Sequence, residues 1–197
     1  HLAVANSNFD LAYSNGTVVL VDLDLLENEL TSGCPDEGCD PVEESDFVLR
    51  EETVAIGSYA SSLVRAPQGN RMYVTVRGDT SLTWLETDMD AGSGSRLTCF
   101  DPSTPPSQRK CDGTHRVSSG LPADPASIHI TRRSHELSDE GGDPDSEILV
   151  DWIFVTHLTS GKVSVFESEV QEEPDRGLPP RLVLVSVCIL MGVALEL

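Results

Sequence analysis

The stretch Met72-Tyr73-Val74-Thr75-Val76-Arg77-Gly78-Asp79-Thr80-Ser81-Leu82-Thr83-Trp84-Leu85-Glu86 decides the fold of this 197-residue chain. An apolar, β-branched run is followed by a short polar turn and a second β-rich run that ends in an acid, a pattern typical of an antiparallel hairpin. The same pattern occurs in residues 2–22 and again in residues 153–167. Such internal self-similarity predicts a repeat architecture built from one recurring unit.

The local patterns around these units predict short strands and no amphipathic helix, so we expect an all-β fold. Runs at 54–57, 62–65, 72–76 and 81–86 alternate with turn-forming residues, which favours a four-stranded antiparallel meander. We expect a single segment over residues 1–197, with repeat units in about 1–24, 54–87 and 115–167. Acidic or cysteine-closed loops are expected in 25–53, 88–114 and 134–151, and an apolar tail in 178–197.

The chain is strongly acidic, with 13 Lys and Arg against 33 Asp and Glu and a formal net charge of −20. That field would repel a phosphate backbone, so the composition disfavours nucleic-acid binding. Its acidic loops could attract a divalent cation, although charge density alone does not make a site. The apolar tail is too short for the roughly 17 to 25 residues of a membrane-spanning helix. We expect no transmembrane span, and a buried strand in the tail.

Four of the five cysteines fall into two local pairs. Cys34 and Cys39 bracket one acidic loop, and Cys99 and Cys111 bracket a loop rich in Pro, Ser and Thr. Pairs of this kind favour disulfides that close long loops in an oxidising compartment. Four cysteines allow three connectivities, and proximity in sequence only favours the local one. A zinc site is the alternative, but neither pair has the usual spacing.

Candidate chemistry is sparse. Asp88 and Asp90 precede a glycine-rich segment and are weak candidates for a metal site, but the loop lacks the further acids that a helix-loop-helix calcium site requires. His157 lies at a junction between strand and turn, where a single histidine without partners is more often a polar turn residue than a ligand. His129 alternates with two isoleucines and should point away from the core. No catalytic residue and no cofactor motif is evident.

The second unit resembles a known repeat. Ile56-Gly57, Pro67-x-Gly69, the run Met72-Tyr73-Val74-Thr75 and Leu82-x-x-Leu85-Glu86 are similar to the YVTN-type β-propeller repeat of surface and periplasmic proteins. Gln68 and Val76 depart from the usual Asp and Asn. The cysteine-closed insertions resemble those of YncE-like secreted or lipoprotein propellers of Gram-negative bacteria. The resemblance implies four-stranded blades in an incomplete ring, because a closed propeller needs about four to eight blades.

The resemblance implies a secreted, periplasmic or outer-surface location and a non-catalytic binding or scaffold role, with a protein or small-molecule ligand. One alternative is a lactonase-type hydrolase with a divalent cation in the channel, for which Asn6, Asp79 and His157 stand at equivalent junctions. A second alternative is an interaction protein of the cell envelope. An incomplete ring would also leave sheet edges open to self-association.

Overall fold

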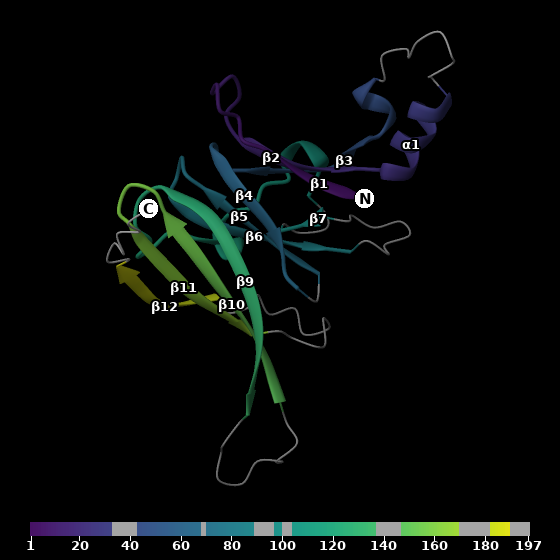
Figure 1. Cartoon of the computed structure of the whole chain (residues 1–197). Helices are drawn as coiled ribbons and strands as arrows, with labels where there is room; N and C mark the ends of the chain where they lie inside the picture. The colour runs from purple at the N-terminus through teal and green to yellow at the C-terminus, as the bar shows by residue number, and fades with distance from the viewer. Residues whose placement is uncertain are drawn as a thin grey trace, which may run out of the picture.

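The computed structural model describes residues 1–32, 43–67, 70–88, 97–99, 104–136, 147–169 and 182–189. Three sheets of antiparallel strands form most of this part of the chain, so the all-β expectation is confirmed. The second sheet lies between the first and the third (Figure 1). Neither a closed barrel nor a closed propeller ring is found among the described residues.

Each sheet is assembled largely from consecutive strands. The first contains β1 (Leu2–Asn6), β2 (Gly16–Val21) and β3 (Val48–Ile56). The second contains β4 (Ala60–Arg65), β5 (Arg71–Val76), β6 (Ser81–Thr87), β7 (Leu97–Thr98) and β8 (Arg116–Val117). The third contains β9 (Pro125–Glu136), β10 (Glu147–His157), β11 (Lys162–Glu169) and β12 (Leu182–Ile189). The third is thus a four-stranded meander in chain order.

The three repeated hairpins, β1–β2, β5–β6 and β10–β11, have the same register. The paired residues at the start of each hairpin are Leu2 with Val21, Met72 with Leu85 and Ile153 with Phe166. Because side chains alternate between the two faces of a strand, one register places equivalent residues on equivalent faces. The repeat found in the sequence is therefore also a repeat of strand pairing.

Two apolar clusters hold the stack together, one at each interface of the second sheet. The first joins the inner face of the first sheet to β5, β6 and β7, and includes Leu20, Val54, Val74 and Leu85. The second joins the opposite face of the second sheet to the third sheet, and its members are Ala66, Tyr73, Leu82, Trp84, Ile128, Ile130, Ile153, Val155 and Phe166. The second sheet contributes to both cores, with one face in each.

Two short segments belong to sheets other than those expected. Residues 54–56 end β3 and pair with β2 in the first sheet, and do not open the second meander. Residues 116–117 form β8 and pair with β6 in the second sheet, and do not open the third. A strand's apolar pattern shows that it is buried but does not say which neighbour it pairs with. The last strand of the third sheet comes instead from the apolar tail, as β12.

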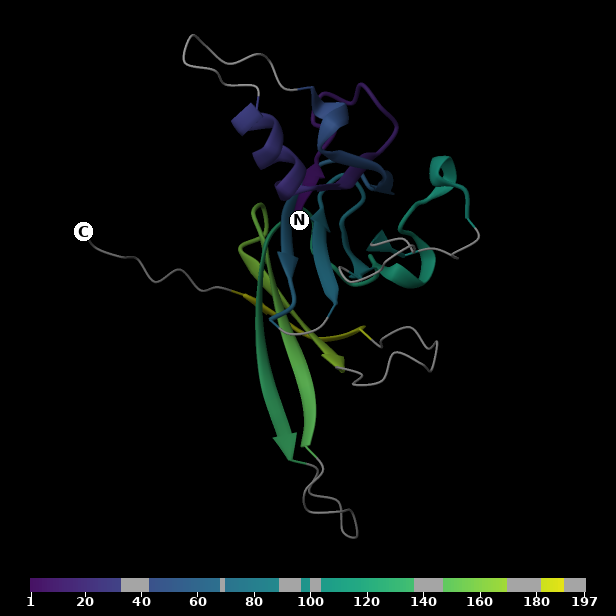
Figure 2. The ribbon, with the colours of Figure 1, turned by 90° about the vertical axis from the view of Figure 1, so that its right-hand side faces the viewer.

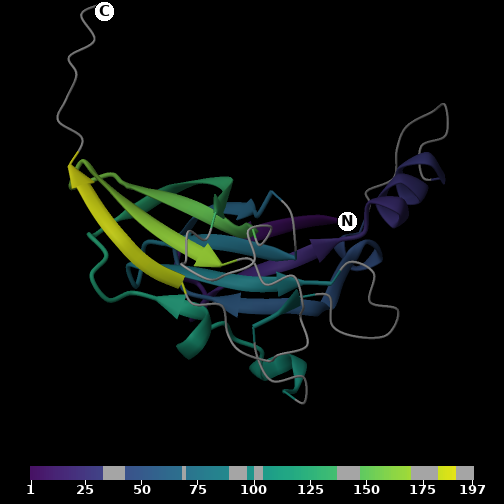
Figure 3. The same ribbon diagram turned by 90° about the horizontal axis from the view of Figure 1, so that it is seen from below.

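A helix stands where a loop was expected in 25–53. α1 (Leu23–Ser32) begins after Asp22, whose carboxylate Oδ1 accepts hydrogen bonds from the backbone N–H groups of Asp24, at 3.0 Å, and Leu25, at 3.2 Å. This is an N-cap arrangement. The helix buries no residue and lies beside the sheets (Figure 3). It has no core-facing stripe, so its apolar periodicity could not reveal it.

Other short elements depart from the expected loops. η1 (Glu44–Asp46), η2 (Pro106–Gln108) and η3 (Gly113–His115) are single 3-10 turns. β9 continues to Glu136 and β10 begins at Glu147, so both strands reach into the expected loop 134–151. Together they form a long two-stranded projection (Figure 2). Among the described residues, no helix is sufficiently long and apolar to cross a bilayer.

Candidate functional site

Four connections meet at one end of the sheet stack, and we call them the loop row: residues 7–15, 57–59, 77–80 and 122–124. Backbone hydrogen bonds join the first three of these connections in order. The N–H of Tyr59 donates to the carbonyl of Ser7 at 2.6 Å, and the N–H of Gly78 donates to the carbonyl of Ser58 at 3.0 Å. The N–H of Arg77 also donates to the carbonyl of Tyr59 at 3.0 Å. The 57–59 turn is thereby held between two hairpin loops.

Asn8 organises the β1–β2 loop from within. Its side chain is buried, and its amide nitrogen donates to the carbonyl of Tyr13 at 2.5 Å and to Ser58 Oγ at 3.1 Å. Its amide oxygen accepts from the N–H of Tyr13 at 3.0 Å. A buried amide that is bonded at both ends fixes the loop around it. The loop therefore has a defined shape that presents its remaining side chains outward.

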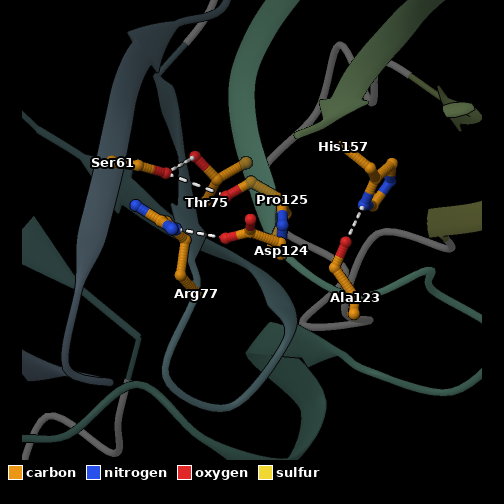
Figure 4. A network of polar contacts seen from close by, with 7 residues as sticks. All are labelled: Ser61, Thr75, Arg77, Ala123, Asp124, Pro125 and His157. Atoms are coloured by element: carbon orange, nitrogen blue, oxygen red, sulfur yellow. Dashed lines mark hydrogen bonds and ion pairs between the residues drawn. The ribbon is translucent and has the colours of Figure 1, made fainter. Parts of the chain in front are cut away.

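Polar contacts continue the loop row to the third sheet (Figure 4). The guanidinium of Arg77 forms an ion pair with Asp124. Ser61 Oγ donates to the carbonyl of Pro125 at 3.0 Å and shares a 3.0 Å hydrogen bond with Thr75 Oγ1. These contacts connect the second sheet with the start of β9 across the interface. Arg77 is 40% exposed and Asp124 is 15% exposed, so the pair is reachable from solvent.

An open pocket of about 290 Å³ lies in this row, lined by Phe9, Tyr59, Arg77, Gly78 and Asp124. The rings of Phe9 and Tyr59 meet edge to face, with centroids 5.7 Å apart. Phe9 is nevertheless 75% exposed. Phe9 thus presents an exposed aromatic ring at the edge of the pocket, whereas Tyr59 is half-buried.

Left-handed backbone conformations concentrate in the same loops. Among the described residues other than glycine, positive φ angles occur at Asn8 (49°), Leu11 (54°), Tyr59 (60°), Thr80 (49°) and Asp124 (64°). Asn and Asp tolerate this region, whereas a β-branched or bulky side chain is strained in it. Backbone strain of this kind persists where the surroundings enforce it, and it gathers at functional sites. All five positions lie in the loop row.

His157 lies beside the loop row, and each of its ring nitrogens already has a hydrogen-bond partner. The imidazole is 3% exposed, with Nε2 2.9 Å from Ser164 Oγ and Nδ1 3.3 Å from the carbonyl of Ala123. Burial lowers the pKa of His157 below its ordinary value, because the charged form would lose solvation. The histidine is thus a core residue that links β10, β11 and the loop before β9. His129, by contrast, is exposed on the opposite face, as predicted.

The other junction residues also have local partners. Asn6 Oδ1 accepts from the N–H of Asn8 at 3.0 Å, and Asp79 binds Arg116 at 2.8 Å and Ser81 Oγ at 2.5 Å. Asp88 is exposed, and Asp90 lies outside the described residues. No group of three or more His, Cys, Asp or Glu that could hold a metal ion occurs in the described part of the chain.

The predicted pairing of Cys99 with Cys111 is confirmed. The two residues form a disulfide with Cα atoms 5.1 Å apart, and both are buried in the first apolar cluster. The other predicted pair, Cys34 and Cys39, lies outside the described residues.

A second polar cluster lies inside the interface between the second and third sheets. Arg132 donates from Nε and Nη2 to the two carboxylate oxygens of Asp151, at 2.8 and 2.9 Å. Nearby, Tyr73 donates its hydroxyl to Ser168 Oγ at 3.3 Å. Burial raises the pKa of Tyr73, which keeps it a neutral donor. Asp151, Tyr73 and Ser168 are all buried between the two sheets, so we assign the cluster to sheet packing.

Sequence reasoning did not single out the residues of the loop row, Phe9, Tyr59, Arg77 and Asp124. Arg77 was noticed only as part of a turn. The one available signal was the presence of aromatic residues within otherwise polar loops, which singly is common on protein surfaces. Comparison with family models, curated proteins and solved structures found no match to this chain.

Proposed function

We propose that this chain is a non-catalytic binding module of β-propeller type, related to the YVTN and YncE-like proteins, and that its ligand docks on the loop row. Three stacked sheets with one hairpin register support the propeller part of the proposal, because propeller blades repeat in this manner. The observation that carries the binding role is the open pocket lined by Phe9, Tyr59 and Arg77.

The chemistry of the pocket favours a peptide segment as ligand. Aromatic side chains and arginine dominate the energetic centres of protein interfaces, since they combine large apolar area with fixed hydrogen-bond donors. Here Asp124 fixes the Arg77 guanidinium and the contact with Tyr59 orients Phe9. The net charge of −20 disfavours a polyanionic ligand. An uncharged or basic peptide that carries an apolar anchor residue fits both features.

Selection from a random displayed-peptide library against the immobilised chain tests this proposal. Peptides that are enriched on the unsubstituted chain are expected to lose about tenfold or more in affinity for Phe9→Ala and for Arg77→Ala, a loss typical of interface centres. Leu158→Ala is the matched control, because Leu158 is 66% exposed but does not line the pocket. Failure to enrich any peptide, or equal affinity for all three variants, would contradict the proposed site.

The non-catalytic part of the proposal has a separate test. A lactonase-type hydrolase would need a cation in the channel, held by ligands from several sheets. We expect elemental analysis of the purified chain to find no stoichiometric divalent ion. A bound ion at one equivalent would overturn this part of the proposal and favour the hydrolase.

We further propose a secreted, periplasmic or outer-surface location, as the YncE-like resemblance implies. The Cys99–Cys111 disulfide supports it, because such bonds persist in oxidising compartments. Protein isolated from its source under alkylating conditions should carry no label on these two cysteines. Full labelling of both before reduction would contradict an oxidising location.

A further inference from the structure

Within the part of the chain that the structure describes, the two terminal sheets of the stack each have one apolar face that no other sheet covers. On the first sheet this face contains Leu2 and Val4 of β1, which are 51% and 38% exposed. On the third sheet it contains Trp152, Phe154 and Val163, which are half-buried. These two faces lie on opposite sides of the molecule, away from the second sheet (Figure 1).

The shared register shows what these faces correspond to. In the second and third sheets, the residues equivalent to Leu2 and Val4 point toward the preceding sheet and are almost wholly buried: Met72 at 6%, Val74 at 0%, Ile153 at 0% and Val155 at 0% exposed. The first sheet therefore displays the surface that elsewhere in this chain packs against a preceding sheet.

The third sheet displays the complementary surface. Phe154 is the register equivalent of Tyr73, which points toward the following sheet and is 1% exposed in the second apolar cluster. Val163, on the same face of β11, corresponds likewise to Leu82, which is 0% exposed in the second apolar cluster. The same kind of interface already forms twice within the chain, in the two apolar clusters. In each cluster, the face of one sheet that points toward the next sheet packs against the face of the next sheet that points back.

We propose that a second copy of this chain covers both faces. The third sheet of one copy packs on the first sheet of the other, head to tail, and the reciprocal contact closes the assembly. Two copies then contribute six sheets, within the range of about four to eight in which propeller rings close. Each contact joins two different surfaces, the third sheet of one copy and the first sheet of the other, and a two-fold axis relates the two contacts. This inference does not depend on the proposed peptide site, since it involves the sheet faces and not the loops.

The mass of the full chain in solution tests the assignment. Light scattering at physiological salt, where repulsion between the acidic copies is screened, should give twice 21.3 kDa at micromolar concentrations. Leu2→Asp and Phe154→Asp should each raise the dissociation constant about tenfold or more, because a charge would be buried in the contact. Leu158→Asp, at an exposed leucine in the β10–β11 turn, should leave the mass unchanged.

Mixing the two face variants distinguishes a head-to-tail contact from a symmetric one. The unsubstituted third sheet of the Leu2→Asp chain can still meet the unsubstituted first sheet of the Phe154→Asp chain. Through this one intact contact, the mixture should form a dimer at concentrations at which neither variant alone does. Circular dichroism should show that both variants remain folded. A mass of 21.3 kDa at all concentrations, a dimer that Leu2→Asp leaves intact, or no recovery on mixing would each overturn the head-to-tail assembly.

Discussion

At the scale of single residues, the polar groups inside the stack determine how stability depends on pH and charge. His157 is buried with both ring nitrogens near partners, and its pKa is lowered. In the unfolded chain the imidazole titrates near its ordinary value of about 6.5. The unfolded state therefore binds more protons than the folded state as pH falls through that value. The contribution of His157 to the free energy of unfolding is fully present above about pH 6.5 and is lost as the pH falls below that value.

We accordingly expect the free energy of unfolding to fall between about pH 7.5 and pH 5.5, with a smaller fall in His157→Gln, which keeps hydrogen-bonding capacity without the titration. Urea unfolding at several pH values measures the slope. His115, whose pKa is also lowered by burial, contributes in the same direction and remains in both proteins. An unchanged slope in His157→Gln would show that this imidazole does not govern the pH dependence.

Asp151 provides a second test at this scale. Its carboxylate is 5% exposed and binds Arg132 with two hydrogen bonds, so Asp151→Asn leaves a guanidinium without its buried counter-charge. We expect this substitution to lower the free energy of unfolding by about 3 kcal/mol. Arg133→Gln, at the exposed neighbour on β9, should change it by less than about 0.5 kcal/mol. Equal effects of the two substitutions in denaturant titrations would argue against the buried pair.

At the scale of elements, close contacts between turns shape the loop row. A Cβ on Gly78 would lie 2.7 Å from the carbonyl oxygen of Ser58 and 3.2 Å from the Tyr59 ring. Gly161, in the equivalent β10–β11 turn, has open space around its Cβ position, although its φ of +59° makes a side chain strained there. The two turns therefore need glycine for different reasons.

From this difference we expect Gly161→Ala to cost about 1 kcal/mol through backbone strain alone, and to leave peptide binding unchanged. Gly78→Ala should instead displace the 57–59 turn and weaken binding at the pocket. Chemical-shift mapping of the Tyr59 and Arg77 amides would measure that displacement. Similar shifts at these amides in both variants would contradict the contact between the turns.

The disulfide is the second feature at this scale. Cys99 and Cys111 are separated by 12 residues and join the segments after β7 and before β8, inside the first apolar cluster. Their reduction should lower the free energy of unfolding by about 2 to 3 kcal/mol, as the loop entropy predicts. Denaturant unfolding with and without reductant measures this loss. Equal free-thiol counts under the two conditions would contradict the bond.

At the scale of the whole molecule, the second sheet couples the two cores. Leu20→Ala, a truncation in the first cluster, should cost about 2 to 5 kcal/mol. Trp84 lies in the second cluster, and Trp152→Phe leaves it as the single tryptophan. If the two clusters unfold together, the Trp84 fluorescence of the Leu20→Ala variant should show the same shifted unfolding transition as its circular dichroism. An unshifted Trp84 transition would mean that the two interfaces unfold separately.

The sequence by itself determined the all-β class and the three hairpins and favoured the Cys99–Cys111 pairing, because alternation along a strand, turn chemistry and short loop closure are local properties. It also indicated correctly that His129 points away from the core. Only the tertiary structure decided that residues 54–56 and 116–117 join neighbouring sheets, because either strand edge can accept a buried strand. The same holds for the loop row: Phe9, Tyr59, Arg77 and Asp124 are distant in sequence, and the packing of three sheets brings them together.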